Sequence, residues 1–411
     1  MQNLLKKNDM LNPILNATLN LTQSCNLACS YCFNYGKTSK RMPFDVGKKC
    51  IDFLLMNARE ADEISLRGRK RNVTVTFWGG EPLIEWDLLK KLIAYVEKVH
   101  KEIPFEIGTT TNGTLLTEDK MKYFGDHHFA ALISFDGTPE SHDRYRHYHD
   151  GRGSHAVIAG NIEKALKLHP GLRVRMSPYA EGVHRFYGDV KYIIDMGIKN
   201  LMFSPVYEGT WTADHWKTFQ SECDRVINLL LEYRKKGIAI DIEHYKTYAK
   251  TDNSRWPCGA GRFYVGFDVD GAIYPCHRFI KFTDQRHWSK REVCLGHVDY
   301  GTTNPIFRDQ FIDFKPVKCG TCEYDKITPC HGGCYAVNYD LAGNIRTAPE
   351  SLCSYTRMQS GISRSYREKY GPKGFPQANE MPAAPPKPED FMAVLIQMEK
   401  KISIIERNLN V

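Results

Sequence analysis

Short runs of β-branched and aromatic residues alternate with longer amphipathic stretches between about residues 15 and 245. In the stretch 87–101, for example, Leu88, Leu92 and Val96 recur at helical spacing, which predicts a helix with one buried face. The predicted strands are Ile14–Thr22, Val73–Trp78, Phe105–Thr111, Ala130–Phe135, Arg173–Pro178 and Leu201–Pro205. The predicted helices are Asp45–Arg59, Asp87–Lys101, Glu118–Phe124, His155–Leu168, Gly188–Met196 and Ala213–Lys235. Six strand-then-helix units in series indicate an α/β fold and favour a barrel or partial barrel over an open sheet.

The pattern changes after about residue 253. Residues 255–360 contain eight of the 13 cysteines and show no long helical pattern, so we expect a small cysteine-rich domain held by metal or covalent links. Residues 371–390, with six prolines, are typical of an extended linker. Residues 391–411 have one apolar face and predict a C-terminal helix, which packs on its own barrel or, less commonly, on a partner.

Composition narrows the class of protein. No run of about 18 apolar residues exists, and residues 1–16 lack the features of a signal peptide, so we expect a cytoplasmic protein without a membrane span. Cysteines in that compartment indicate metal ligation or thiol chemistry rather than disulfides. The net charge of +8 is scattered along the chain, and the dense basic stripe of a nucleic-acid-binding protein is missing.

Three cysteines, Cys25, Cys29 and Cys32, follow the first predicted strand directly. In a barrel, the loops at the carboxyl ends of the strands carry the chemistry. Three thiolates within eight residues are able to bind three irons of one cubane and leave the fourth iron open, although a zinc knuckle uses similar spacings.

The CxxxCxxC motif, Tyr31 within it, and Gly79-Gly80-Glu81-Pro82 after the second strand resemble the radical S-adenosylmethionine (SAM) superfamily. The resemblance covers roughly residues 14–245 and implies a partial (β/α)6 TIM-type barrel. It also implies a [4Fe–4S] cluster at Cys25, Cys29 and Cys32 whose open iron is chelated by SAM. The implied SAM contacts are Tyr31, the amine-binding segment Gly79, Gly80 and Glu81, the ribose-binding Ser134 and Asp136, and the carboxylate-binding Arg146.

The C-terminal cysteines resemble the SPASM extension of peptide-modifying radical SAM enzymes, which implies two auxiliary [4Fe–4S] clusters. By this resemblance the nearer cluster takes Cys258, Cys276 and Cys334, and the distal one takes Cys319, Cys322, Cys330 and Cys353. Two cubanes need eight protein ligands and this pattern supplies seven. Either the nearer cluster has an open iron, which a substrate thiolate is able to ligate, or Cys294 fills the place. Two zinc sites are the alternative for these spacings. Cys50 and Cys223 lie in helical patterns and are expected in the core.

The resemblance implies a 5′-deoxyadenosyl radical that abstracts hydrogen from a peptide residue, and three [4Fe–4S] clusters with SAM as cofactors. Two family functions fit: maturases that install thioether or C–C crosslinks in ribosomally made peptides, and anaerobic sulfatase-maturing enzymes that convert Cys or Ser to formylglycine. The latter carry an aspartate base after the cysteine that corresponds to Cys276, where this chain has His277, and many peptide maturases have Cys-His there. His277 is the candidate proton acceptor, with a structural hydrogen bond beside the cluster as the alternative.

The partners expected are a peptide, Cys-containing if the open-iron hypothesis holds, and an electron donor such as flavodoxin or ferredoxin. Only some 14 residues precede the first strand, too few for a leader-binding domain, so leader recognition falls to another region or to a separate protein. The alternative hypothesis, in which the protein is not an enzyme, is a zinc-binding scaffold protein.

Overall fold

The computed structural model describes residues 13–34, 37–64, 72–101, 103–247, 258–283, 290–312, 330 and 332–370. The predicted linker and tail helix, residues 371–411, and the ligand candidates Cys319 and Cys322 lie outside these ranges.

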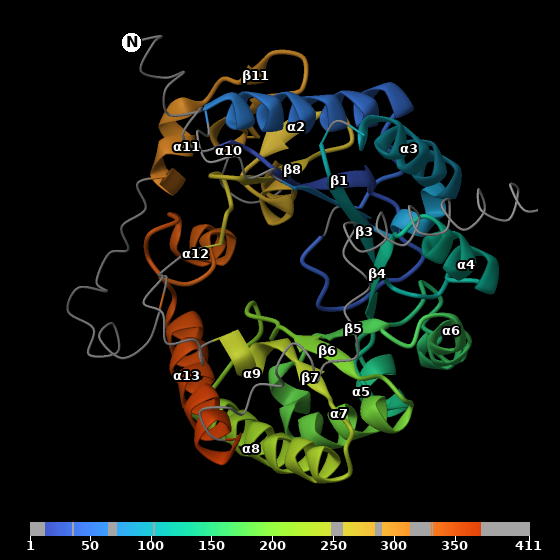
Figure 1. Cartoon of the computed structure of the whole chain (residues 1–411). Coiled ribbons are helices and arrows are strands. Elements are labelled where there is room, and N and C mark those ends of the chain that lie inside the picture. Colours follow the sequence, from blue (N-terminus) through green and yellow to red (C-terminus); the bar gives the residue numbers. More distant parts are fainter. Residues whose placement is uncertain are drawn as a thin grey trace, which may run out of the picture.

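A single curved sheet forms the centre of the molecule (Figure 1). Its first seven strands are parallel and adjacent in chain order: β1 Asn16–Thr22, β2 Val73–Gly79, β3 Phe105–Thr111, β4 Ala130–Ser134, β5 Arg173–Met176, β6 Asn200–Phe203 and β7 Asp241–Ile242. In the described sheet, β7 and β11 (Gly301–Thr302) are the edge strands, so the ring is not closed. The prediction of a partial barrel is confirmed.

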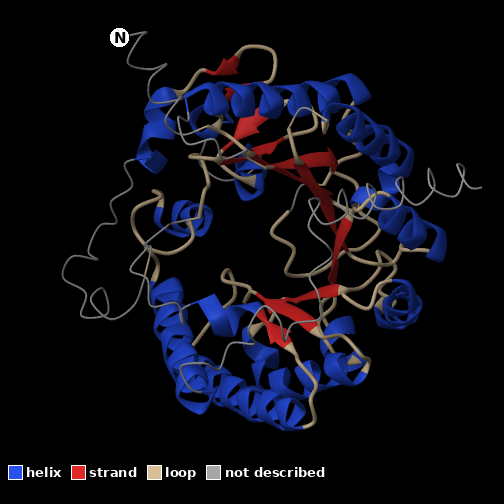
Figure 2. Cartoon of the chain, viewed as in Figure 1, coloured by secondary structure: helices blue, strands red, loops and turns tan. Residues whose placement is uncertain are grey.

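Helices lie on the outside of this curved wall (Figure 2). The main ones are α2 Phe44–Ile64, α3 Trp86–Val99, α4 Glu118–Asp126, α6 His155–Leu168, α7 Phe186–Asp195 and α8 Ala213–Lys235. Short elements between them are η1 Pro82–Glu85, α5 Pro139–Asp143, η2 Ala180–Arg185 and α9 Glu243–Thr247. All six predicted helices are therefore present, each with bounds within a few residues of those expected from the apolar periodicity. None of the helices in the described ranges is long and apolar enough to cross a bilayer.

The two faces of the strands differ in polarity. On β2, Val73, Val75 and Phe77 are buried beneath the helices, whereas Thr74, Thr76 and Trp78 point to the inside of the curved wall. Barrels of the TIM type fill this interior with branched apolar side chains. Here the inner residues surround a cavity of about 450 Å³, which we call the lumen cavity.

The cysteine-rich segment continues the barrel sheet rather than forming a separate one. Strand β8 (Tyr264–Phe267) pairs in parallel with β1, and β9 (Ala272–Tyr274), β10 (Gly296–His297) and β11 follow as antiparallel neighbours. The remaining elements are η3 His277–Thr283, α10 Lys290–Val293, α11 Pro305–Ile312 and α12 Tyr335–Ala342. This continuity places the Cys276 turn beside the start of the barrel.

A long helix, α13 (Glu350–Tyr370), corrects the expectation that residues 255–360 contain no long helix. The helix packs against α8 and α9 on the open side of the ring (Figure 1). Its buried face includes the polar residues Thr356, Gln359 and Ser363 beside Leu352 and Ile362. Because polar residues interrupt the apolar positions of the buried face, the helical period is too weak in the sequence to predict this helix.

Candidate active site

The loop Cys25–Cys32, here called the cluster loop, leaves the carboxyl end of β1 and lies against the end of β2. The backbone N–H of Gly80 donates to the Thr22 carbonyl (2.8 Å), and that of Glu81 donates to the Ser24 carbonyl (2.9 Å). A Cβ atom on Gly79 would lie 2.4 Å from the Thr22 oxygen, and one on Gly80 would lie 2.1 Å from the Ser24 oxygen. Both glycines are therefore required by backbone packing against the cluster loop, a reason that the sequence did not disclose.

Glu81 is fully buried and connects this turn to β3. Its Oε1 accepts from the Leu83 N–H (3.0 Å) and the Thr111 hydroxyl (2.7 Å), and its Oε2 accepts from the Asn112 N–H (2.7 Å). Burial raises the pKa of Glu81, and the hydrogen bonds oppose that rise. The carboxylate thus fixes the loop geometry, and three donors on its roughly four acceptor sites leave capacity for one more.

The turn after β3 also contacts the cluster loop. The Asn112 Nδ2 donates to the Asn26 side-chain oxygen at 2.9 Å and lies 3.9 Å from the Cys25 sulfur. Asn26 in turn donates to the Thr114 hydroxyl at 2.8 Å. Ends of three successive strands are therefore bonded to one another around Cys25.

The polar segment 142–152 pairs with the other edge of the cluster loop. The N–H of Ala28 donates to the His147 carbonyl (2.8 Å), and the N–H of Ser30 donates to the Tyr145 carbonyl (3.0 Å). The His149 Nε2 lies 2.9 Å from the Cys25 carbonyl oxygen. The segment is thus a structural support of the loop.

Tyr31, Asp136 and Arg146 meet in one buried cluster. The Asp136 carboxylate accepts from Arg146 Nε (2.7 Å), the Ser177 N–H (2.8 Å) and the Tyr31 hydroxyl. Burial raises the pKa of Asp136, but the Arg146 guanidinium outweighs it and the net pKa is lowered. The structure therefore joins three of the residues predicted to contact SAM to one another. Ser134 ends β4 beside them, where its backbone pairs with Arg175.

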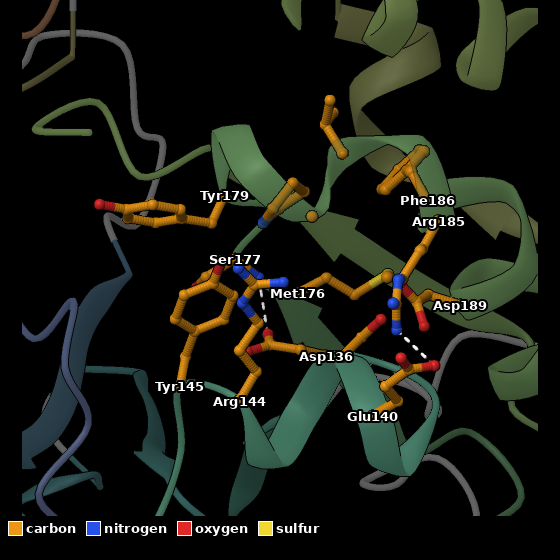
Figure 3. A pocket seen from close by; sticks show the side chains of 14 residues that line it. Asp136, Glu140, Arg144, Tyr145, Met176, Ser177, Tyr179, Arg185, Phe186 and Asp189 are labelled. Atoms are coloured by element: carbon orange, nitrogen blue, oxygen red, sulfur yellow. Dashed lines mark hydrogen bonds and ion pairs between the residues drawn. The ribbon is translucent and has the colours of Figure 1, made fainter. Parts of the chain in front are cut away.

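A small pocket opens beside this cluster, at the ends of β4 and β5 (Figure 3). Asp136 lies at its centre, Tyr145 and Tyr179 form one side, and the ion pair between Glu140 and Arg185 lies on the other. The two tyrosine rings pack with centroids 4.8 Å apart. Aromatic walls beside a polar floor suit a ligand with a flat apolar part and hydroxyl groups.

The lumen cavity contains His277. Its ring lies 5.2 Å from Trp78 and 5.8 Å from Phe33, measured between centroids. The His277 Nδ1 is 2.6 Å from the Tyr264 hydroxyl, which is 2.7 Å from the Thr18 hydroxyl. Burial, with Arg278 and Arg175 nearby, lowers the pKa of His277 to about 3, so the imidazole is neutral. Sequence reasoning missed Trp78, Tyr264 and Thr18, although each lies on the inner face of a predicted or adjacent strand.

The cysteines assigned to the first and the nearer auxiliary cluster are gathered in two groups. In the cluster loop, burial raises the pKa of Cys29 to about 11, and the thiols of Cys32 and Cys25 add to the rise. Burial likewise raises the pKa of Cys276, with further increases from Cys334 and Cys258. Grouped thiols of this kind fit ligands of iron–sulfur clusters, because a thiophilic metal stabilises the thiolate that burial disfavours at Cys29 and Cys276.

Other cysteines take varied positions. Cys330 and Cys353 are partly buried, and Cys50 and Cys223 are core residues, as expected. The Cys294 thiol donates to the Gly296 carbonyl (3.2 Å). Within the described ranges, no three His, Cys, Asp or Glu side chains are grouped as ligands of a single metal ion.

Comparison with known proteins gives a family match for part of the chain. The model of the radical SAM superfamily matches residues 19–176. The chain is 24% identical over 327 residues to a cysteine-type anaerobic sulfatase-maturating enzyme of Clostridium novyi (strain NT), covering 74% of this chain and 83% of that protein.

Two solved structures share the fold. The structure described as native anSMEcpe with bound AdoMet and Cp18Cys peptide has a TM-score of 0.68 and 19% identity, covering 90% of this chain and all of that one (100%). Streptococcus suis SuiB bound to precursor peptide SuiA has a TM-score of 0.56 and 15% identity, covering 85% and 78%. Residues 19–176, which include Cys25, Gly80 and Asp136, match the radical SAM superfamily, so the chain contains a radical SAM domain there.

Proposed function

We propose that this protein is a radical SAM maturase that oxidises a residue of a ribosomally made peptide and forms a thioether or carbon–carbon crosslink. One observation carries the proposal: the lumen cavity borders both cysteine groups. Phe33 follows Cys32 directly, His277 follows Cys276 directly, and both side chains line the cavity. A substrate side chain held there lies between the two redox sites.

The proposal assigns SAM and one [4Fe–4S] cluster to the cluster loop and auxiliary [4Fe–4S] clusters to the C-terminal cysteines, as in SPASM domains. When bound, these groups supply hydrogen abstraction and electron acceptance. Tyr31, Asp136, Arg146 and the Gly79–Glu81 turn are the residues proposed to hold SAM. The structures of anSMEcpe and SuiB with bound peptides support a peptide as the substrate class. A flavodoxin or ferredoxin is the proposed electron donor. A separate protein is proposed to recognise the leader of the peptide.

His277 is the proposed proton acceptor. In the tautomer with the proton on Nδ1, His277 donates to the Tyr264 oxygen, and Tyr264 donates to Thr18. The Nε2 atom then keeps a lone pair that neither Tyr264 nor Thr18 contacts, and this lone pair is able to accept a proton from the substrate. Tyr264 thus positions His277 and selects its useful tautomer.

Formylglycine formation is the second candidate. It is favoured by the similarity to the sulfatase-maturating enzyme of Clostridium novyi, which extends over about three quarters of this chain. A neutral imidazole is able to replace the carboxylate base expected there by resemblance, so His277 is compatible with either reaction.

Anaerobic reconstitution of the full chain tests the proposal. About twelve irons per chain and reductive SAM cleavage are expected for three cubanes. A short Cys-containing peptide encoded beside this chain is then incubated with the enzyme and analysed by mass spectrometry. Loss of two hydrogens with one thiol blocked supports crosslinking, and an aldehyde in place of a Cys side chain supports formylglycine. A colourless protein that binds only zinc and leaves SAM intact contradicts both.

A further inference from the structure

Arg175 lies in the middle of β5 and points into the lumen cavity. Its neighbours on the strand, Val174 and Met176, are buried on the opposite face. The cavity wall around Arg175 includes the hydroxyls of Thr18 and Thr76 and the aromatic ring of Trp78. Arg175 therefore brings a positive charge to a polar, partly enclosed space.

The other cations in this region are paired with carboxylates. Arg146 bonds to Asp136, with both side chains at most 9% exposed. Arg278 pairs with Glu208. Lys281 pairs with Asp340 at 3.1 Å.

Arg175 differs from these cations. Among the described residues, its side chain has neither a hydrogen bond nor an ion pair within the protein. Burial, together with the charges of Arg278 and Arg146, lowers the pKa of Arg175. Its neighbours therefore add positive charge rather than balance it, and the nearby Asp136 carboxylate already has three donors.

A partly buried guanidinium without a counter-charge is costly to the folded protein unless a ligand supplies the acceptor. The planar fork of arginine matches a carboxylate in two parallel hydrogen bonds. Threonine hydroxyls add donors, and Trp78 offers an apolar surface to an aliphatic stem. An acidic residue with a short side chain fits this combination.

We propose that Arg175 binds a carboxylate of the peptide substrate, namely an Asp or Glu side chain at or beside the modified residue. The inference deepens the proposed function, since it assumes that a peptide enters the lumen cavity. It makes Arg175 a specificity-determining residue and predicts that the substrate peptide is acidic near its reactive position.

The test compares Arg175→Met with Arg173→Met. Arg173 lies on the same strand, but its side chain is 57% exposed and paired with Glu243. The probes are pools of acetylated, amidated nonapeptides with a fixed central Cys. One pool has Asp or Glu beside the Cys, a second has Asn or Gln there, and a third is neutral with a free C-terminal carboxylate. Binding to the reconstituted full chain is measured by equilibrium dialysis in the presence of SAM without reductant, so that no turnover is needed.

The wild type and Arg173→Met are expected to retain the acidic pool at least about tenfold more strongly than the amide pool, and Arg175→Met is expected to lose that preference. Equal retention of the two pools by the wild type, including retention of neither, overturns the proposal. So does a preference that survives in Arg175→Met. Preference for the third pool alone assigns Arg175 to a C-terminal carboxylate and overturns the side-chain assignment.

SAM binding is measured in parallel, because SAM also carries a carboxylate. Loss of SAM affinity in Arg175→Met with an unchanged peptide preference overturns the proposal in favour of a SAM contact. If the wild type prefers acidic peptides but modifies none, the result contradicts the proposed function alone. If it modifies a peptide but shows no preference for acidic ones, the result contradicts only the role of Arg175.

Discussion

The two groups of cysteines are built in different ways. Cys25, Cys29 and Cys32 lie on one loop, which the ends of β2 and β3 and the segment 142–152 hold through backbone and side-chain hydrogen bonds. Cys258, Cys276 and Cys334 come from three separate parts of the chain, and Cys334 is the residue directly before α12. The first site is thus shaped by its neighbours before a cluster binds. The second is assembled by the tertiary fold, and a bound cluster would link its parts.

The largest effect expected separates the two sites by the step that each supports. Cys25→Ala removes a proposed ligand of the SAM-binding cluster, and we expect SAM cleavage to fall to background. Cys276→Ala leaves that cluster intact, so we expect SAM cleavage without product. Both are measured by chromatography of 5′-deoxyadenosine and mass spectrometry of the peptide. Equal SAM cleavage by Cys25→Ala and the wild type would refute the assignment.

A buried ion pair in the first site gives the next largest effect. Arg146→Met leaves the Asp136 carboxylate buried without its cation, which costs about 3–5 kcal/mol in similar cases. We expect a large drop in the thermal midpoint, measured by circular dichroism, together with weaker SAM binding. The control is Arg152→Met, whose pair with Asp150 is exposed and therefore contributes little to stability. A midpoint equal to that of the control contradicts the proposed role of the pair.

The contrast between the sites also explains what the sequence could predict. Six of the seven parallel strands and the contiguous motif Cys25–Cys32 follow from local patterns of hydrophobicity and spacing, whereas the two-residue strand β7 is too short to show one. That Asp136 bonds to Arg146, or that Gly80 meets the Ser24 carbonyl, depends on how strand ends come together. Local sequence carries no signal for these contacts.

Tertiary structure hides other features as well. Helix α13 was missed because its buried face carries Gln359 and Ser363 among apolar residues. The Tyr264–Thr18 hydrogen bond depends on β8 pairing with β1, a contact between residues 246 positions apart in the chain. The sequence predicts that Arg175 lies on a strand, but only the structure shows that its side chain faces the lumen cavity.

Close packing beneath the cluster loop is tested by Gly80→Ala. The added Cβ would meet the Ser24 carbonyl oxygen at 2.1 Å, so either β2 or the loop that carries Cys25 must shift. We expect incomplete iron incorporation at the first cluster, measured by iron analysis and electron paramagnetic resonance. Gly160→Ala is the control, because no atom lies within 4 Å of its added Cβ and alanine favours its helix α6. Full iron content in Gly80→Ala would show that the loop adapts without loss.

Tyr264→Phe probes the side of the cavity near Cys276. The variant keeps the ring and removes the hydroxyl that contacts His277 Nδ1 and Thr18. We expect product formation to fall about tenfold, as for loss of a supporting hydrogen bond, while SAM cleavage and iron content stay unchanged. The ratio of 5′-deoxyadenosine to product measures this uncoupling, and a ratio equal to that of the wild type would remove Tyr264 from the reaction.

The smallest effect concerns the pH dependence of stability in the support of the cluster loop. Buried His142 accepts from the Asp136 N–H (3.2 Å) through Nδ1, and its Nε2 lies 3.0 Å from the Ser154 hydroxyl. Burial lowers the pKa of His142 to about 3, whereas the unfolded chain has its ordinary value of about 6.5. Above about pH 6.5 the ring is neutral in both states. Below it the unfolded state binds the extra proton, so stability falls with falling pH by up to about 1.4 kcal/mol per pH unit, until about pH 3.

His142→Gln keeps a polar side chain of similar length and removes the titration. Denaturant unfolding of the wild type and the variant between pH 7.5 and 5 measures the difference, and the wild type should lose about 2 kcal/mol more over this range. His169→Gln is the matched control, since the His169 ring also bonds to backbone, at the Met121 carbonyl (2.8 Å), but lies outside the support of the cluster loop. A parallel pH profile in His142→Gln and the wild type would mean that the loop support tolerates a charged ring, and the first site would then be less rigid than its hydrogen bonds indicate.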